Sequence, residues 1–349
     1  MNKKKTIIEI DIMKKFFKGV LYALLSIVII LIAAFAYQVF ETNSDKRNYP
    51  YPGYLISVNG NNMHLIIRGK KTPGNPTIIL IGGLGATSPT WSLVQPQLQK
   101  TLHVVAYDRA GYGWSDSQPS TRDGITIAKE LHEMLASAGV SGPYIVVAHS
   151  LGGLYGRIFT SLYANEVKKL ILVESTHPDQ FVRTAAGKNE LLTINKNLGM
   201  ARIAAEFGIM RLNNLCKLPS SFPKKDADEI KAFCASTTNW QTQFDEMKSI
   251  PVTMQQVRNS PLPGNIPLLI ISAGQHLKDD PQWAVFQDEL TSLSKNSKMI
   301  TIKDASHVSV WTDSTHATKL CDAIMNFSVL HVATSKSLPT RLIPIEGTI

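Results

Sequence analysis

The stretch that decides the fold is "YIVVAHSLGGLYGR", residues 144–157. Its first half is rich in β-branched residues, as in a buried strand, and its second half continues as a helix. At the junction lies Ser150, with Ala148 two residues before it and Gly152 two residues after it. A sharp strand–serine–helix turn is a nucleophile elbow, which needs small residues at these two positions; the usual first glycine is alanine here. We therefore expect Ser150 Oγ to project above a sheet, with the Leu151 N–H placed at the helix N-terminus to stabilise an oxyanion.

Other short apolar runs surround this elbow and alternate with helical patterns. Two alternating runs around Asn59-Gly60 predict a β-hairpin. Further strands are predicted in "NPTIILIGG", "LHVVAYDRAGYGWSD", "VKKLILVES", "IPLLIISAGQ" and "SKMITIKDASH". The segment "ITIAKELHEMLASAG" has its apolar residues on one helical face, and Gly139 is expected to end that helix. This alternation predicts an α/β fold with a mostly parallel sheet covered by helices on both faces.

The pattern also suggests how the chain is divided. Residues 176–265 lack strand signals and read as a helical lid inserted between two strands of one core, which comprises residues 54–175 and 266–328. Residues 41–53 form a polar linker containing prolines. The tail, residues 329–349, has no pattern to which a role can be assigned.

The N-terminal part of the chain predicts a membrane anchor. Residues 20–40 contain no charge, and as a helix they would be about 31 Å long, which suits a bilayer core. Residues 1–19 contain six lysines against two acidic residues, and this excess favours a cytoplasmic N-terminus and an exported domain. A cleaved signal peptide is the alternative, because "AFA" at 34–36 resembles a cleavage site, but the apolar run is long for that purpose.

Charge and cysteines exclude some classes of function. The net charge of +9 is concentrated at the N-terminus. The sequence has no basic stripe with interleaved aromatic residues, which is the pattern that predicts nucleic-acid binding. The three cysteines have no metal-binding spacing, so we expect no metal. Outside the cytoplasm Cys216 and Cys234 could pair, although buried thiols are the simpler interpretation and spacing alone cannot decide.

Two further motifs complete the pattern around the elbow. The loop "IGGLGATSPTW" follows a buried strand and could direct the Leu84 N–H at the same oxyanion. "DASHVSVW" places His307 just beyond the last predicted strand, so a histidine follows the serine late in the chain. The order serine, acid, histidine fits the hydrolase sheet rather than the other serine-hydrolase orders.

On these motifs the chain resembles the α/β-hydrolase superfamily over about residues 54–327. "DRAGYGWSD" is similar to the loop after the fourth strand in ester- and amide-cleaving members. The resemblance implies that Ser150 is the nucleophile, His307 the general base, and the N–H groups of Leu84 and Leu151 the oxyanion hole. It implies no metal, nucleotide or organic cofactor. The His-Gly that usually precedes the oxyanion residue is Gly82-Gly83 here.

The acid of the triad has two candidates. The family commonly places it after the strand "IPLLIISAGQ", where this chain has His276, which cannot serve; Asp279 lies three residues further on. Some relatives, including dehalogenase-like ones, use an acid at the end of the preceding strand, where this chain has Glu174. We favour Glu174 because an acid that holds the histidine's tautomer should come from a fixed position.

The resulting hypothesis is a single-pass, membrane-anchored serine hydrolase that cleaves a carboxylic ester through an acyl-enzyme. An aminopeptidase or amidase resembling proline iminopeptidase is the first alternative, since such members share the core. A catalytically silent binding module is the second. A serine at the elbow argues against epoxide opening and dehalogenation, for which relatives use an aspartate. The expected partners are a small ester or amide substrate and the membrane.

Overall fold

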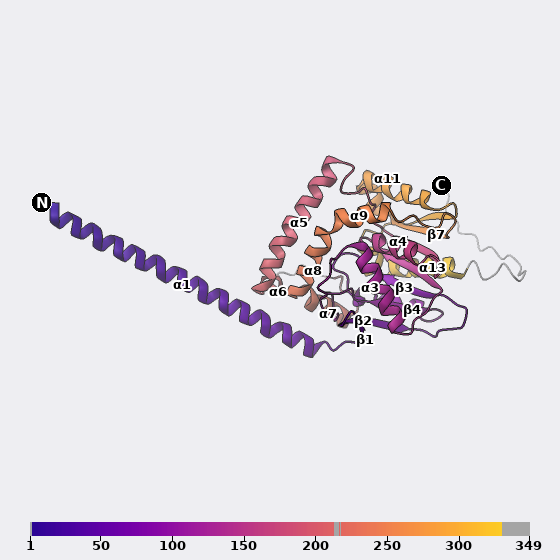
Figure 1. Cartoon of the computed structure of the whole chain (residues 1–349), viewed down its shortest axis with the longest axis horizontal. Helices are drawn as coiled ribbons and strands as arrows, with labels where there is room; N and C mark the ends of the chain where they lie inside the picture. Colours follow the sequence, from indigo (N-terminus) through magenta and orange to yellow (C-terminus); the bar gives the residue numbers. More distant parts are fainter. Residues whose placement is uncertain (1, 213–215, 217, 330–349) are drawn as a thin grey trace, which may run out of the picture.

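The computed structural model describes residues 2–212, 216 and 218–329. A long N-terminal helix leads to a domain built on one sheet (Figure 1). The strands are β1 (Tyr54–Val58), β2 (Asn61–Arg68), β3 (Thr77–Ile81), β4 (His103–Tyr107), β5 (Tyr144–His149), β6 (Val167–Val173), β7 (Leu268–Ala273) and β8 (Ser297–Ile302). The predicted tail lies outside the described residues except for its first residue, Val329.

The sheet has the predicted mostly parallel form. Its strand order is β1-β2-β4-β3-β5-β6-β7-β8, with β3 to β8 parallel and with β1 and β2 added as an antiparallel edge. The two-residue turn Asn59-Gly60 joins β1 to β2 with positive φ at both residues, as a tight hairpin requires. Because parallel strands end at the same edge, the loops after β3, β5, β6, β7 and β8 converge there.

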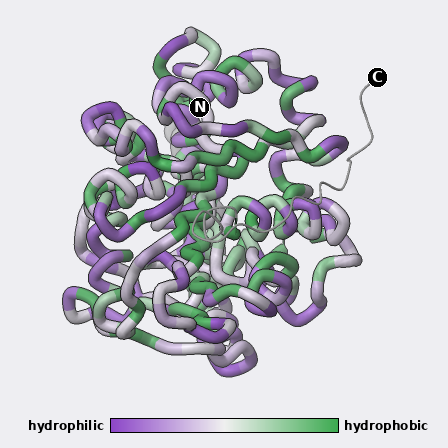
Figure 2. The backbone as a smooth tube through the Cα atoms, turned by 90° about the vertical axis from the view of Figure 1, so that its right-hand side faces the viewer, coloured by the Kyte–Doolittle hydropathy of each residue, from purple (hydrophilic) through white to green (hydrophobic). Residues whose placement is uncertain are grey.

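Helices cover both faces of the sheet. Alternate strand residues enter two separate apolar clusters, so that Val146 lies in one and Val147 in the other. The first cluster packs under α3 (Gly124–Ser137), α4 (Gly152–Leu162) and α9 (Ile250–Arg258), and the second under α13 (Ser314–Val329). Figure 2 shows hydrophobic stretches through the middle of the domain and hydrophilic ones around them. This arrangement confirms the predicted fold class.

Between β6 and β7 the described residues form helices and no strand. These helices are α5 (Ala185–Glu206), α6 (Ile209–Leu212), α7 (Lys224–Cys234), α8 (Thr237–Lys248) and α9. The remaining short helices flank the core: η1 (Ser88–Trp91), α2 (Gln95–Leu98), α10 (Gly274–Asp279), α11 (Pro281–Glu289), η2 (Leu290–Leu293) and α12 (Ser309–Thr312). Below, "the insertion" means residues 176–265.

The helix α1 (Asn2–Asn48) contains the predicted anchor. Within the described residues it is the one helix long and apolar enough to cross a membrane. It continues into the predicted linker 41–53 and ends just before Tyr49-Pro50, since residues 41–48 contain no glycine or proline and Lys46 and Arg47 lie favourably at its C-terminal end. Only residues 49–53 therefore connect this helix to β1.

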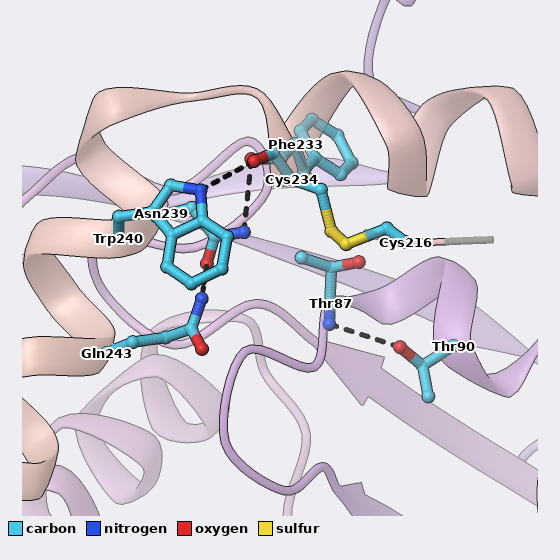
Figure 3. Close-up of a disulfide and its surroundings, with 8 residues drawn as sticks. All are labelled: Thr87, Thr90, Cys216, Phe233, Cys234, Asn239, Trp240 and Gln243. Carbon is cyan, nitrogen blue, oxygen red and sulfur yellow. Dashed lines mark hydrogen bonds between the residues drawn. A yellow bond between two sulfur atoms is a disulfide. The ribbon is translucent and has the colours of Figure 1, made fainter. Parts of the chain in front are cut away.

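Cys216 and Cys234 form a disulfide in the insertion, whereas Cys321 is free and buried. The interpretation of all three as buried thiols is thus wrong for the first two. Figure 3 shows the environment of the bridge: Trp240 Nε1 donates to the Cys234 carbonyl (2.7 Å) and Asn239 Nδ2 to the Phe233 carbonyl (3.0 Å). These bonds join the end of α7 to the start of α8. The disulfide is therefore attached to α7 at the point where that helix is hydrogen-bonded to α8.

Candidate functional site

The turn at Ser150 has the geometry of a nucleophile elbow. Ser150 lies between β5 and α4 with φ of 54°, a conformation that is strained for serine, and its N–H donates to the Val173 carbonyl (3.0 Å). A Cβ on Gly152 would lie 2.5 Å from the carbonyl oxygen of Gly82, which is backbone and cannot yield easily. The methyl of Ala148 is accommodated, because Gly156 on α4 faces it with no side chain of its own.

We expect Gly152→Ala to lower the free energy of unfolding by about 1–3 kcal/mol, because the added methyl overpacks a closely fitted turn. Gly264→Ala is the matched control, since a Cβ there meets no atom within 4 Å. Urea unfolding of the two variants in detergent checks this. Equal unfolding midpoints for both variants would show that the turn is not closely packed.

Three side chains from three strand ends form a hydrogen-bonded chain. Ser150 Oγ lies 3.0 Å from His307 Nε2, and His307 Nδ1 lies 3.0 Å from Glu174 Oε2. Ser150 follows β5, Glu174 follows β6, and His307 lies in the loop after β8. Asp279, the other candidate acid, is exposed at the end of α10, and among the described residues it has no hydrogen bond to His307. The structure therefore brings Glu174, and not Asp279, to His307.

Glu174 is completely buried and fully occupied by donors. Its Oε1 accepts the Ala273 N–H (2.6 Å) and the Trp283 Nε1–H (3.4 Å), while its Oε2 accepts from His307 and from His276 Nδ1 (2.6 Å). Burial by itself would raise the pKa of Glu174, but these hydrogen bonds outweigh it and lower the pKa to about 2. The carboxylate thus stays ionised at any physiological pH.

This lowered pKa predicts acid-dependent stability. The folded pKa of about 2 lies below the ordinary value of 4.5, so ionised Glu174 stabilises the fold above pH 4.5, and this contribution of up to about 3 kcal/mol is lost as the pH falls towards 2. We expect the difference in unfolding free energy between the wild type and Glu174→Gln to shrink between pH 6 and pH 3. A constant difference across that range would contradict the assignment.

His276 is the residue whose contact was not expected from the sequence. It occupies the position where an acid was sought after β7, and instead it donates to Glu174, a contact that raises the pKa of His276 although burial opposes it. The end of β6 is paired with β7, with Val173 beside Ile271. Because the ends of these strands are neighbours, a prediction of this pairing would also have predicted that Glu174 and His276 lie close together.

The predicted oxyanion donors, Leu84 and Leu151, line one cavity with Ser150 and His307. Among the described residues, neither backbone N–H is paired with a protein acceptor. The cavity measures about 740 Å³ and lies between the sheet edge and the insertion. Its walls are mainly apolar and include Phe181, Ile194, Met247, Trp283 and Phe286, with Glu190 and Asp280 as acidic residues. An apolar pocket of this size with convergent polar groups at one end suits a small organic substrate.

A buried ion pair holds the loop that carries Leu84. Arg109 donates to the carbonyls of Gly82 (2.6 Å) and Gly83 (2.7 Å), and its Nε–H donates to Glu246 on α8 of the insertion (2.8 Å). Glu246 also accepts from Tyr112 (3.0 Å). Asp108 braces the other side of the loop by accepting the Ser88 N–H (2.5 Å) while it contacts buried His64 (2.8 Å). Asp108 and Arg109 thus both brace the loop that carries Leu84, through separate partners.

Removing the carboxylate that faces Arg109 should be costly. We expect Glu246→Gln to lower the free energy of unfolding by about 3–5 kcal/mol, because Arg109 would be left as an unpaired buried charge. Glu289→Gln breaks a half-exposed pair with Arg183 and should cost no more than about 1 kcal/mol. Denaturant unfolding of both variants tests this, and similar losses would mean that Arg109 does not depend on Glu246.

His149, next to the serine, is buried. Its Nε2 lies 3.1 Å from the His307 carbonyl, and burial, followed by the nearby His307, lowers the pKa of His149 to about 3. The neutral imidazole of His149 therefore contacts the backbone of the His307 loop and adds no charge to the site.

Comparison with known proteins agrees with this fold. Residues 76–192 match the family model described as alpha/beta hydrolase fold. An uncharacterised protein of Schizosaccharomyces pombe is 27% identical over 74% of this chain and 53% of its own length. A Cronobacter turicensis protein with the provisional name carbamate hydrolase RutD is 36% identical over 32% of this chain and 42% of its own. The crystal structure of the Cif epoxide hydrolase from Acinetobacter nosocomialis superimposes with a TM-score of 0.66 at 19% identity, over 84% of this chain and 96% of that one.

The fold defines the class of this protein. The chain has the α/β-hydrolase fold, and residues 76–192 match the model of that family. It spans about half the length of the first curated relatives that it matches.

Proposed function

We propose that this chain is a membrane-anchored serine hydrolase that cleaves a carboxylic ester through an acyl-enzyme. The observation that carries the proposal is the chain of hydrogen bonds from Ser150 Oγ through His307 to Glu174. In this mechanism His307 Nε2 takes the serine proton while Oγ attacks the ester carbonyl carbon. Glu174 holds the tautomer in which His307 Nδ1 carries a proton and Nε2 is free to accept one.

The remaining steps use the same groups. The N–H groups of Leu84 and Leu151 stabilise the tetrahedral oxyanion, and Arg109 fixes the loop that aims the first of them. When the tetrahedral species collapses, the C–O bond of the ester breaks and His307 returns the proton to the departing alcohol. A water molecule, deprotonated by His307, then attacks the acyl-enzyme and releases the acid and Ser150.

For the location we propose that residues 20–40 of α1 span the membrane, with the N-terminus in the cytoplasm and the catalytic domain outside it. The lysines of residues 1–19 favour this orientation. The Cys216–Cys234 disulfide is consistent with it, because disulfides persist in oxidising compartments. The insertion would serve as a lid over the cavity.

A second candidate, cleavage of an aminoacyl amide, has one observation in its favour. Glu190 and Asp280 both line the cavity that holds Ser150, and the negative charge of Asp280 helps burial to raise the pKa of Glu190. Two carboxyl groups in a mainly apolar pocket could hold the ammonium group of such a substrate.

One experiment tests the reaction and separates the candidates. The full chain in detergent is treated with a fluorophosphonate probe beside Ser150→Ala and His307→Ala, with Ser57→Ala as the control because Ser57 is exposed on β1. Labelling should persist in the control and disappear in the two site variants. The chain is then assayed on p-nitrophenyl esters and on aminoacyl p-nitroanilides. Faster cleavage of the anilides would favour the second candidate, and a folded chain that is not labelled would leave a binding module.

A further inference from the structure

An exposed apolar strip runs along the outer side of the insertion. On α5 the side chains of Leu192, Met200 and Ile203 are 68%, 54% and 57% exposed, and their spacing places them on one side of the helix. Ile209 and Leu212 on α6 continue the strip, with Leu212 80% exposed. Exposed apolar side chains gathered on one side of a helix are typical of an interaction site. We call these five residues the outer strip.

The outer strip is distinct from the cavity. Gly187, Glu190 and Ile194 on α5 line the cavity that holds Ser150, whereas the residues of the outer strip do not. The helix α5 also packs against α8 on its inner side. Thus α5 separates the cavity from the outer strip.

Contacts between α1 and the insertion fix where the outer strip lies. Gln38 on α1 is buried: its Nε2 donates to the Ala235 carbonyl (2.8 Å), and its Oε1 accepts from Arg211 Nε (2.7 Å). Arg211 also pairs with Asp45 (2.7 Å), and Gly208, between α5 and α6, faces Tyr37. The insertion therefore contacts α1 at the point where the apolar segment 20–40 ends.

Figure 1 shows that α5 runs across the direction of α1, with the rest of the domain on the side away from the N-terminus. A helix that spans a bilayer lies roughly along the membrane normal, so a helix crossing its end lies along the membrane surface. Lys188 and Lys196 are exposed on the same side of α5, each one turn from Leu192, and long lysine side chains can extend from such a surface to lipid headgroups.

We propose that the outer strip docks onto the bilayer that α1 spans, at the boundary between lipid headgroups and acyl chains. This inference rests on the membrane anchor proposed above and does not depend on catalysis. The occupant is lipid because α5 runs across the end of the anchoring segment, and the outer strip is on the side of α5 opposite to the cavity. A second copy of the chain on the same strip is the alternative that the test separates.

The test uses the full chain in phosphatidylcholine–phosphatidylglycerol vesicles. Single cysteines at Leu192 and Met200 are labelled with an environment-sensitive nitrobenzoxadiazole dye, and quenching by nitroxide-labelled lipids is measured. The unsubstituted chain gives the background, since Cys321 is buried and the other two cysteines are bonded to each other. Ile29→Cys reports on the anchor. Leu162→Cys is the matched control, an exposed apolar residue at the end of α4, on the sheet edge opposite the cavity.

Docking predicts that the labels at 192 and 200 shift to shorter emission wavelengths and are quenched by the nitroxide lipids, while the label at 162 is not. If the labels at 192 and 200 emitted as they do in water while the label at 29 was quenched, docking would be overturned and the membrane anchor would stand. An unquenched label at 29 would overturn the anchor and docking together. A blue shift at 192 and 200 without lipid quenching would overturn lipid docking in favour of a protein contact.

A second variant separates docking from mere proximity. In Ile203→Cys carrying the dye, the added changes Leu192→Asp and Met200→Asp should reduce lipid quenching to the level of Leu162→Cys. Because both aspartates lie on exposed positions outside the cavity, fluorophosphonate labelling of Ser150 in detergent should be unchanged. Unchanged lipid quenching in this variant would mean that the strip does not hold the domain on the membrane.

Discussion

Replacing Ser150 by alanine is expected to lower kcat for an activated ester by about a million-fold, because the alcohol that forms the acyl-enzyme is lost. The Leu84 and Leu151 N–H groups and the cavity would remain. Residual hydrolysis should therefore exceed the rate in water by about a thousand-fold or more. Steady-state assays on p-nitrophenyl esters measure this, with the enzyme concentration fixed by absorbance and not by active-site titration.

The control for this result is Ser57→Ala, which should keep full activity. Both variants should keep an unfolding free energy within about 1.5 kcal/mol of the wild type, because Ser150 Oγ contributes only its hydrogen bond to His307. If Ser150→Ala retained activity within tenfold of the wild type, the nucleophile would have to be another group, and the proposed mechanism would be wrong.

Glu174→Gln is expected to lower kcat by about ten-thousand-fold. The glutamine amide can still accept the Ala273 N–H, but its NH₂ group facing His307 Nδ1 would favour the tautomer in which Nε2 carries the proton. That tautomer cannot take the proton of Ser150, which lies 3.0 Å from Nε2. The kcat of the variant and its rate of fluorophosphonate labelling should fall together.

Asp279→Asn is the matched control, since it removes the other acid that the sequence offered. We expect it to change kcat by less than about twofold, because Asp279 is exposed and has no hydrogen bond to His307 among the described residues. A large loss in Asp279→Asn together with a small one in Glu174→Gln would reverse the assignment of the acid. A small loss in both would leave His307 without an essential partner.

The sheet and the elbow were predictable because their signals are local. The hairpin follows from Asn59-Gly60 between alternating strands, and the elbow from Ser150 between a strand and a helix with small neighbours. His307 was placed by its position after the last apolar run. In each case a few consecutive residues determine the backbone, so no contact between distant segments had to be known.

The remaining features depend on contacts between distant segments. Glu246 lies 137 residues from its partner Arg109, and neither residue carries a pattern that names the other. Cys216 and Cys234 pair because two parts of the insertion meet, which their spacing alone does not determine. The contact of His276 with Glu174 follows from strand pairing. Where the chain lacks a regular period, as in the insertion, the sequence predicts the type of structure but not its contacts.

The buried link between Arg109 and Glu246 limits how freely the insertion can be exchanged. The described part of residues 176–265 contributes no strand to the sheet, so topology alone would allow the whole segment to be exchanged. Here one carboxylate of that segment holds the arginine that positions the Gly82 and Gly83 carbonyls. A transplanted segment would have to supply an equivalent acid, so new specificity in this chain should evolve more readily by point substitution around the cavity than by recombination of the whole segment.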